Sequence, residues 1–216
     1  MLHYLFLEYN DSMKRGLFIT FEGADGCGKT TQLNMLKDYL TGKNYDVLLT
    51  REPGGRGLGE KVREILLNYD GVVSDRCESF LFLADRAQNI DIIVNPAVEQ
   101  GKIVLCDRHT DSTVAYQGYG RGLDIEQINM LNNLATHNQK PDLTFVFDVD
   151  IETSMKRVGQ NKDRMENSGM EFFNRVRNGY LQLAKNEPNR IKVIDSTKTI
   201  DEVFEDVKKI IDSYLT

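Results

Sequence analysis

The sequence predicts an α/β fold, a three-layer sandwich in which helices flank both faces of a five-stranded parallel sheet. Short apolar runs alternate with stretches of helical length, and the chemically suggestive residues directly follow the apolar runs. Parallel strands joined by crossover helices produce this alternation, and ligands of such sheets bind beyond the carboxyl ends of the strands. The expected strands are residues 17–22, 46–50, 102–107, 143–148 and 190–195.

Length and composition limit the classes of protein that fit. The 216 residues suffice for one well-buried core, so we expect a single domain over residues 15–216. Residues 1–14 are expected to form a peripheral extension, with Met13 as the candidate functional start, because they lack the basic region and cleavage site of a signal peptide. The net charge of -6 provides no basic field for a nucleic-acid polymer. No run approaches a membrane span, and three cysteines without a C-x-x-C pair indicate a reducing, cytoplasmic setting.

The first expected strand ends in a phosphate loop. Residues 23–30 read Gly-Ala-Asp-Gly-Cys-Gly-Lys-Thr, which matches G-x-x-x-x-G-K-[ST]. A strand that ends in this loop and turns into a helix aims backbone N–H groups and the positive helix end at one point, where a polyphosphate fits. Lys29 is placed to reach the β- and γ-phosphates, and the Thr30 hydroxyl to ligate Mg²⁺. The expected ATP-binding residues are Gly23, Ala24, Asp25, Gly26, Cys27, Gly28, Lys29, Thr30 and Thr31.

A helix expected after Asp75 carries candidates for a second pocket. Phe82 and Arg86 are four residues apart and therefore share a helix face. An aromatic ring that stacks beside a guanidinium that donates to a carbonyl makes a platform for a nucleobase. The apolar neighbours of Phe82 leave core packing equally open at this point.

The segment after the third strand, residues 107–122, combines polar and aromatic side chains. Asp107 resembles the strand-end acid that positions Mg²⁺ and its waters, and Arg108 is well placed for a phosphate. An ion pair of this Asp and Arg on the surface is the alternative. A helix that begins near Asp111 presents a hydroxyl, a phenol and an amide on one face, from Thr113, Tyr116 and Gln117.

A polar segment late in the chain is expected to form a mobile lid over about residues 156–169. It is bounded by glycines and almost free of core residues. Its cations can close over phosphates and exclude water, whereas a solvated loop whose charges have no role is the alternative. These cations are Lys156, Arg157, Lys162 and Arg164.

A phosphate loop alone does not separate kinases from GTPases or motor ATPases. A GTP-binding switch is expected to carry an Asn-Lys-x-Asp segment after a later strand, and the sequence has none. The sequence therefore argues against a GTPase.

Five motifs occur in order along the chain: Phe-Glu-Gly-Ala-Asp-Gly-Cys-Gly-Lys-Thr-Thr at 21–31, Arg-Glu-Pro-Gly-Gly at 51–55, Phe-Leu-Ala-Asp-Arg at 82–86, Asp-Arg-His-Thr-Asp-Ser-Thr-Val-Ala-Tyr-Gln-Gly at 107–118 and Asp-Arg-Met-Glu at 163–166. Together they resemble the bacterial type of the thymidylate kinase family, which are P-loop nucleoside monophosphate kinases. The resemblance implies a P-loop NTPase fold and transfer of the γ-phosphoryl group of ATP to dTMP, giving dTDP in dTTP biosynthesis. It also implies a Mg²⁺ requirement and a homodimer, with Cys77 a candidate for the dimer contact.

The resemblance further implies roles for substrate-binding residues. Asp25 is expected to accept a hydrogen bond from the sugar 3′-hydroxyl, and Phe82 to stack on thymine. Arg86 is expected to donate to O4, which disfavours cytosine because its N4 is itself a donor. Tyr116 is expected to crowd the sugar 2′ position. The expected set is Asp25, Glu52, Pro53, Phe82, Arg86, Arg108, Thr113, Tyr116 and Gln117, with Thr113 and Gln117 at the base edge and Arg108 on the acceptor phosphate.

Catalysis is expected to consist of alignment and charge neutralisation, because the acceptor phosphate is already an anionic nucleophile. The expected metal site consists of Thr30, Asp107 acting directly or through water, and Glu166. The expected catalytic residues are Lys29, Asp107, Arg108, Arg157 and Arg164.

The sequence departs from the family pattern at two places. Bacterial members that lack a basic residue in the phosphate loop, as this chain does at Gly26, usually carry an arginine-rich lid. This lid has fewer arginines, with Gly159 or Gln160 where an Arg is often seen. We therefore predict that Arg164 or Arg157 supplies the cation beside the transferred phosphoryl group. Cys27, where Ala or Ser is usual, is either a reactive thiol at a helix end or a small packing residue. A kinase for another nucleotide or a deoxynucleoside, and a catalytically idle nucleotide-binding regulator, are the competing interpretations of the whole chain.

Overall fold

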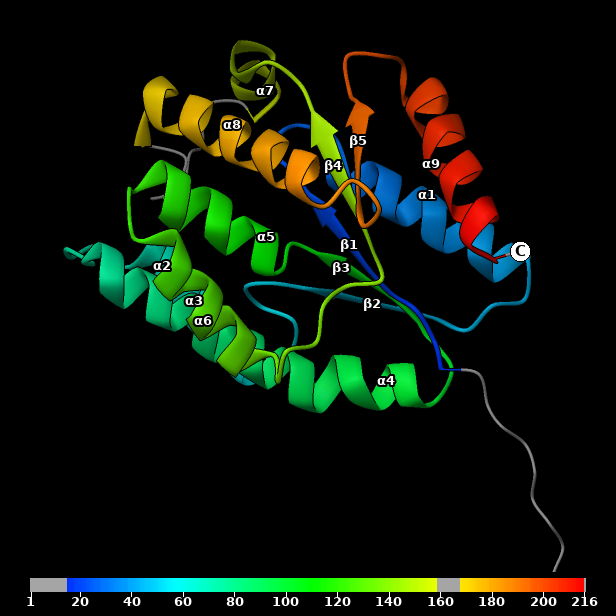
Figure 1. The fold of residues 1–216 in the computed structure, drawn as a ribbon, viewed down its shortest axis with the longest axis horizontal. Helices are drawn as coiled ribbons and strands as arrows, with labels where there is room; N and C mark the ends of the chain where they lie inside the picture. Colours follow the sequence, from blue (N-terminus) through cyan, green and yellow to red (C-terminus); the bar gives the residue numbers. More distant parts are fainter. Residues whose placement is uncertain (1–14, 159–167, 216) are drawn as a thin grey trace, which may run out of the picture.

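The computed structural model describes residues 15–158 and 168–215, which form a five-stranded parallel sheet between two layers of helices (Figure 1). The strand order is β2-β3-β1-β4-β5. This architecture confirms the predicted fold class, and each predicted strand boundary lies within one residue of the observed one. The strands are β1 (Phe18–Glu22), β2 (Val47–Arg51), β3 (Ile103–Asp107), β4 (Leu143–Asp148) and β5 (Ile191–Asp195).

The helices divide between the two faces of the sheet. On one face lie α1 (Lys29–Gly42) and α9 (Ile200–Leu215), which contact each other (Figure 1). The opposite face carries the remaining helices, and α7 (Ile151–Val158) contacts α8 (Met170–Asn186). These elements are α2 (Leu58–Asn68), α3 (Asp75–Asn89), the π-helical η1 (Ile90–Val94), α4 (Asn95–Glu99), α5 (Thr110–Thr113), the π-helical η2 (Val114–Gly120), α6 (Ile125–Ala135) and α8 (Met170–Asn186).

The side chains of β1 point alternately to the two faces of the sheet, so the strand contributes to both apolar cores. Ile19 and Phe21 belong to the cluster formed with α1 and α9, whereas Phe18 packs with η1 and α4 on the other face. Successive side chains of a strand point to opposite faces, so a strand buried on both sides is apolar nearly throughout. Leu36 of α1 is fully buried in the first cluster, which holds the helix that follows the phosphate loop against the sheet.

The central position of β1 in the sheet brings the candidate functional groups together. It pairs with β3 on one side and β4 on the other, so the chain changes its direction of travel across the sheet at β1. A crevice opens at the carboxyl ends of the strands at such a switch point. The phosphate loop and residues 107–122 both begin there.

One prediction about local structure needs correction. The helix expected from Asp111 begins at Thr110 and widens into η2 at Val114, because bonds such as that from Arg121 N to the Tyr116 carbonyl span five residues. The expected lid begins within α7, where Arg157 lies in the last turn. The rest of the lid, with Arg164 and Glu166, and the expected extension of residues 1–14 lie outside the described residues. None of the described helices is long and apolar enough to cross a membrane.

Candidate active site

The phosphate loop joins β1 to α1 in a conformation that only glycine permits at its start. Gly23 has φ +133°, and a Cβ there would lie 2.6 Å from the backbone oxygen of Phe147. Lys29 Nζ donates to the carbonyls of Gly23 at 3.0 Å and Ala24 at 2.9 Å, so its ammonium group is held against the loop. Cys27 is buried in the core between β1 and α1, which favours its interpretation as a packing residue.

A cleft of about 630 Å³ opens in front of this loop. It collects groups that are far apart in the sequence, because the carboxyl ends of β1, β3 and β5 meet at one edge of the sheet. Of the residues predicted to act there, those lining the cleft are Asp25, Gly26, Cys27, Gly28, Lys29, Thr30, Thr31, Glu52, Asp107, Arg108 and Arg157, whereas Gly23 and Ala24 of the loop do not line it.

Asp107 and Thr30 form a wall of the cleft that suits a hard cation. The Oδ1 atom of Asp107 is buried and accepts no hydrogen bond within residues 15–158 and 168–215. A carboxylate oxygen and a hydroxyl are ligands that Mg²⁺ prefers, and this ion commonly completes its shell with water and substrate phosphates. The described residues contain no group of three acidic, His or Cys side chains that would form a full protein cage. The donor set therefore fits Mg²⁺ held jointly with a nucleotide.

Arg108 leaves β3 through a sharp turn that aims it into the cleft. Its φ is +70°, a conformation that residues with side chains rarely adopt and that is often associated with functional sites. Its Nη2 donates to Asp25 Oδ1 at 2.7 Å, and the Tyr116 hydroxyl donates to Asp25 Oδ2 at 3.3 Å. Burial by itself raises the pKa of Asp25, but the Arg108 and Lys29 cations outweigh it and lower the pKa to about 2. Asp25 is therefore an anion at neutral pH.

A narrower pocket of about 70 Å³ adjoins the cleft. Phe82, Pro53, Thr113 and Gln117 line it, and it shares Asp25, Glu52, Arg63 and Arg108 with the cleft. The sequence-predicted ring and guanidinium of α3 both line this pocket, and the Phe82 ring also packs against the buried apolar cluster that contains Tyr116 and Phe172. The remaining lining residues are Leu67, Arg86, Ser112 and Tyr116.

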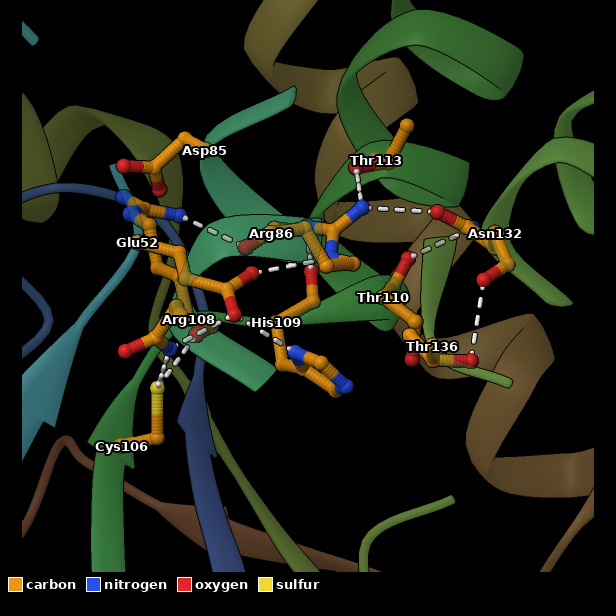
Figure 2. Close-up of polar contacts among 12 residues, drawn as sticks. Glu52, Asp85, Arg86, Cys106, Arg108, His109, Thr110, Thr113, Asn132 and Thr136 are labelled. Carbon is orange, nitrogen blue, oxygen red and sulfur yellow. Dashed lines mark hydrogen bonds and ion pairs between the residues drawn. The ribbon is translucent and has the colours of Figure 1, made fainter. Parts of the chain in front are cut away.

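Arg86 is almost fully buried at the edge of the narrow pocket and is held from several sides (Figure 2). Its Nε donates to Glu52 Oε2 at 2.8 Å, and its Nη1 donates to Thr113 Oγ1 and Asn132 Oδ1, both at 2.7 Å. Its Nη2 donates to the His109 carbonyl at 2.8 Å. The guanidinium group is thus rigidly placed before any ligand binds.

Glu52 lies behind Arg86 and is predicted from the sequence to bind substrate. Its Oε1 accepts from Asn89 Nδ2 at 2.9 Å and from His109 Nδ1 at 3.0 Å. Burial raises its pKa, but His109 and Arg86 outweigh burial and lower the pKa to about 2. Because protein donors bind both carboxylate oxygens, we interpret Glu52 as a support of Arg86; since it also lines both pockets, its role as a ligand of substrate stays a prediction.

The structure adds residues that sequence reasoning missed. Arg63 of α2 lines both pockets and donates through Nη1 to the Pro53 carbonyl at 3.0 Å; it lies in no motif and carries no sequence signal. Arg51 lines the cleft and Ser112 lines the narrow pocket. Both lie inside the sequence motifs, so the sequence held a signal that could have identified them. Lys198 reaches the cleft only because β5 is the neighbour of β4 in the sheet.

A buried carboxyl group lies directly behind Arg108. Glu22 Oε2 accepts from Ser112 Oγ at 2.5 Å and from Tyr180 Oη at 3.0 Å, and Arg108 Nη1 donates to both hydroxyl oxygens at 3.3 Å. Burial and the nearby Asp111 carboxylate raise the pKa of Glu22 to about 7. The network behind Arg108 therefore contains a carboxyl group that titrates near neutral pH.

We predict that this group makes stability fall as pH rises. The folded chain retains a proton on Glu22 that the unfolded chain releases near 4.5, so its contribution is complete below about pH 4.5 and is lost through about pH 7. Between about pH 5 and about pH 8, the free energy of unfolding should fall by up to roughly 3 kcal/mol more in the natural chain than in Glu22→Gln. Urea unfolding across this range measures the difference, and parallel curves for the two proteins would refute the prediction.

Comparisons with known proteins agree with this geometry. The family model described as Thymidylate kinase matches residues 21–207. The chain is 44% identical over 209 residues to a thymidylate kinase of Desulfovibrio desulfuricans, covering 92% of this chain and 96% of that one. It is 48% identical over 199 residues to a thymidylate kinase of Sulfurihydrogenibium sp., with coverages of 92% and 96%.

A solved structure has the same fold. The thymidylate kinase of Ehrlichia chaffeensis superposes with a TM-score of 0.77 at 41% identity, covering 91% of this chain and 98% of that one. The family match, the sequence identity and the shared fold lead to one conclusion: the chain belongs to the thymidylate kinase family.

Proposed function

We propose that phosphoryl transfer occurs where the two pockets join, with ATP in the larger cleft and dTMP in the narrower pocket. As a member of its family, the chain is an enzyme that phosphorylates dTMP to dTDP with ATP as the donor, in dTTP biosynthesis. The observation that supports the proposed placement is the ion pair of Asp25 and Arg108, which lines both pockets. Two anionic nucleotides that enter from opposite sides bring their phosphates together at this pair.

The narrow pocket accounts for recognition of the base. Arg86 has five N–H groups, and four of them donate to Glu52, Thr113, Asn132 and the His109 carbonyl. We propose that the fifth, on Nη2, donates to O4 of thymine while Phe82 stacks on the ring. Cytosine has an amine donor at this place, so its base edge leaves the Arg86 donor unmet.

The junction accounts for recognition of the sugar and the acceptor phosphate. We propose that the anionic Asp25 accepts from the 3′-hydroxyl and that Tyr116 occupies the space beside the sugar 2′ carbon. Arg108 then lies on the acceptor phosphate, where its turn out of β3 holds it. Gln117 donates through Nε2 to Glu78 at 3.1 Å, which fixes its amide at the base edge.

The chain contributes positioned charge, and no strong base is needed. The acceptor phosphate oxygen attacks the γ-phosphorus as the bond to the β-phosphate oxygen breaks, and ADP leaves with that oxygen. Lys29 and Arg108 neutralise charge on the donor and acceptor phosphates. Thr30 and Asp107 would hold Mg²⁺, which when bound neutralises charge on the donor phosphates.

The reaction is tested by ADP release from ATP with dTMP, dUMP, dCMP and thymidine in separate assays. We expect dTMP to exceed dCMP by at least about 100-fold in kcat/KM, because the base edge must meet the Arg86 donor. Thymidine should give no release, since it lacks the acceptor phosphate. A Lys29→Ala preparation controls for contaminating kinases. A higher rate with dCMP or thymidine would indicate a kinase for another substrate, and no release with any of them would indicate an idle regulator.

The lid cation can be identified in the same assay. Arg157 lines the ATP cleft, and its Nη1 and Nη2 donate to the Ser196 carbonyl at 3.3 and 3.4 Å. We predict that Arg157→Ala or Arg164→Ala lowers kcat about 100-fold, as does loss of one donor to a developing anion. The neighbouring Lys156, which pairs with Glu152 at the surface, provides the control variant Lys156→Ala with near-normal kcat. Near-normal turnover of both arginine variants would exclude the prediction.

A homodimer is proposed through the outer surface of α3 and α6. The two helices contact each other, and they expose Phe80 of α3 and Met130 and Leu134 of α6, with 53%, 66% and 75% of each residue accessible; Cys77 of α3 is exposed as well. Exposed apolar patches of this kind mark protein contacts. We predict a mass of two chains in sedimentation equilibrium and a shift toward one chain in Phe80→Asp. A single-chain mass for the natural protein would exclude the dimer.

The proposed location of the enzyme is the cytoplasm, where ATP and dTMP are available.

A further inference from the structure

Asn132 of α6 is a buried side chain that reaches the base-reading arginine from outside the pocket (Figure 2). It lies in none of the sequence motifs and does not line the narrow pocket. Its Oδ1 accepts from Arg86 Nη1 at 2.7 Å, and its Nδ2 donates to the Thr110 carbonyl at 3.4 Å. One amide thus connects α6 with α3 and with the beginning of α5.

The orientation of this amide follows from its two partners. A guanidinium can only donate and a carbonyl can only accept, so Oδ1 must face Arg86 and Nδ2 must face Thr110. Thr136 Oγ1 donates to the Asn132 carbonyl at 2.9 Å, which adds a buried contact at the end of α6. The acceptor presented to Arg86 is therefore fixed in both position and direction.

The contacts of Arg86 show what Asn132 contributes. Glu52 binds at Nε, the His109 carbonyl at Nη2, and Thr113 and Asn132 divide the two hydrogens of Nη1. A planar guanidinium held at three nitrogens cannot rotate or tilt, which fixes the direction of the remaining N–H. Without the Asn132 oxygen, one N–H of the buried Arg86 guanidinium has no acceptor. Turning toward another acceptor then becomes favourable for the guanidinium.

We propose that Asn132 is a positioning residue for base selection, which aims the remaining N–H of Arg86 at the nucleobase. The proposal rests on the proposed role of Arg86 as the donor to thymine O4. Asn132 touches no substrate and acts only through Arg86. Base discrimination by this enzyme then depends on a helix that forms no wall of the substrate pocket.

The decisive variant is Asn132→Leu, which keeps the size of the side chain and removes the acceptor. dTMP and dUMP both present O4, whereas dCMP presents an amine. We expect kcat/KM to fall about tenfold for dTMP and dUMP and much less for dCMP. The dTMP to dCMP ratio therefore falls about tenfold while the dTMP to dUMP ratio stays constant. The KM for ATP should not change, and the loss should appear in the KM for dTMP more than in kcat.

Two variants separate positioning from folding. Asn132→Asp keeps an oxygen acceptor for Arg86 and should retain the dTMP to dCMP ratio. Asn133→Ala changes the exposed neighbour on the same helix and should retain all three rates. If Asn132→Leu unfolds at the assay temperature, Asn132→Ala removes the same acceptor without a branched side chain and replaces it.

The outcomes discriminate between the two proposals. Equal losses with all three nucleotides, or an unchanged dTMP to dCMP ratio, would overturn the role of Asn132. Arg86→Lys, which keeps a cation beside Glu52 but loses the planar fork, is measured in parallel. If Arg86→Lys lowers the ratio and Asn132→Leu does not, only the role of Asn132 fails. If Arg86→Lys also retains the ratio, the proposed role of Arg86 in reading the base fails with it.

Discussion

The register of β1 against β3 is the constraint on which the site depends. Phe21 lies opposite Asp107 in this parallel pair, so the phosphate loop and Arg108 leave neighbouring strands at the same edge of the sheet. The backbone N–H of Arg108 donates to the Phe21 carbonyl at 2.9 Å, which extends the pairing to the first residue of the turn. A one-residue slip would reverse the direction of every side chain on the strand. The proposed ATP cleft, the wall of Thr30 and Asp107 and the ion pair of Asp25 and Arg108 all require this one register.

Buried charge is the second feature on which the site depends, and it serves the placement of a donor more than the stability of the fold. Glu52 and Arg86 are both nearly inaccessible to solvent, and a buried ion pair stabilises a fold little or not at all compared with apolar packing. Here the pair has further polar partners, including His109 and Asn89, so that the charges are compensated within the protein. Such a network holds a donor in a fixed direction before substrate arrives, which is the arrangement that makes electrostatic recognition and catalysis effective.

The same arrangement connects distant parts of the chain to one reaction. Glu22 at the end of β1, Ser112 in α5 and Tyr180 in α8 meet behind Arg108, while Asn132 of α6 meets Arg86. Arg86 and Arg108, which we propose bind substrate, are therefore each backed by residues of other elements. The π-helical segment η2 lies in this region and contributes Tyr116 and Gln117 to the narrow pocket, and widened turns of this kind occur often at functional sites. Binding geometry here is a property of the packed helices and not of the loops alone.

The sequence by itself determined the order of strands along the chain, the phosphate loop and the shared helix face of Phe82 and Arg86, because hydrophobic period and motif spacing are local properties. It left open whether that face packs in the core or lines a pocket, and it could not show that Glu52 supports Arg86, that Arg63 lines both pockets, or that Asn132 contacts Arg86. Those facts join residues 34 or more positions apart or lie in segments without a motif. Only tertiary structure decided them, since the partner of a buried charge is chosen by which elements pack together, and helical periodicity says which face is buried but not what it meets.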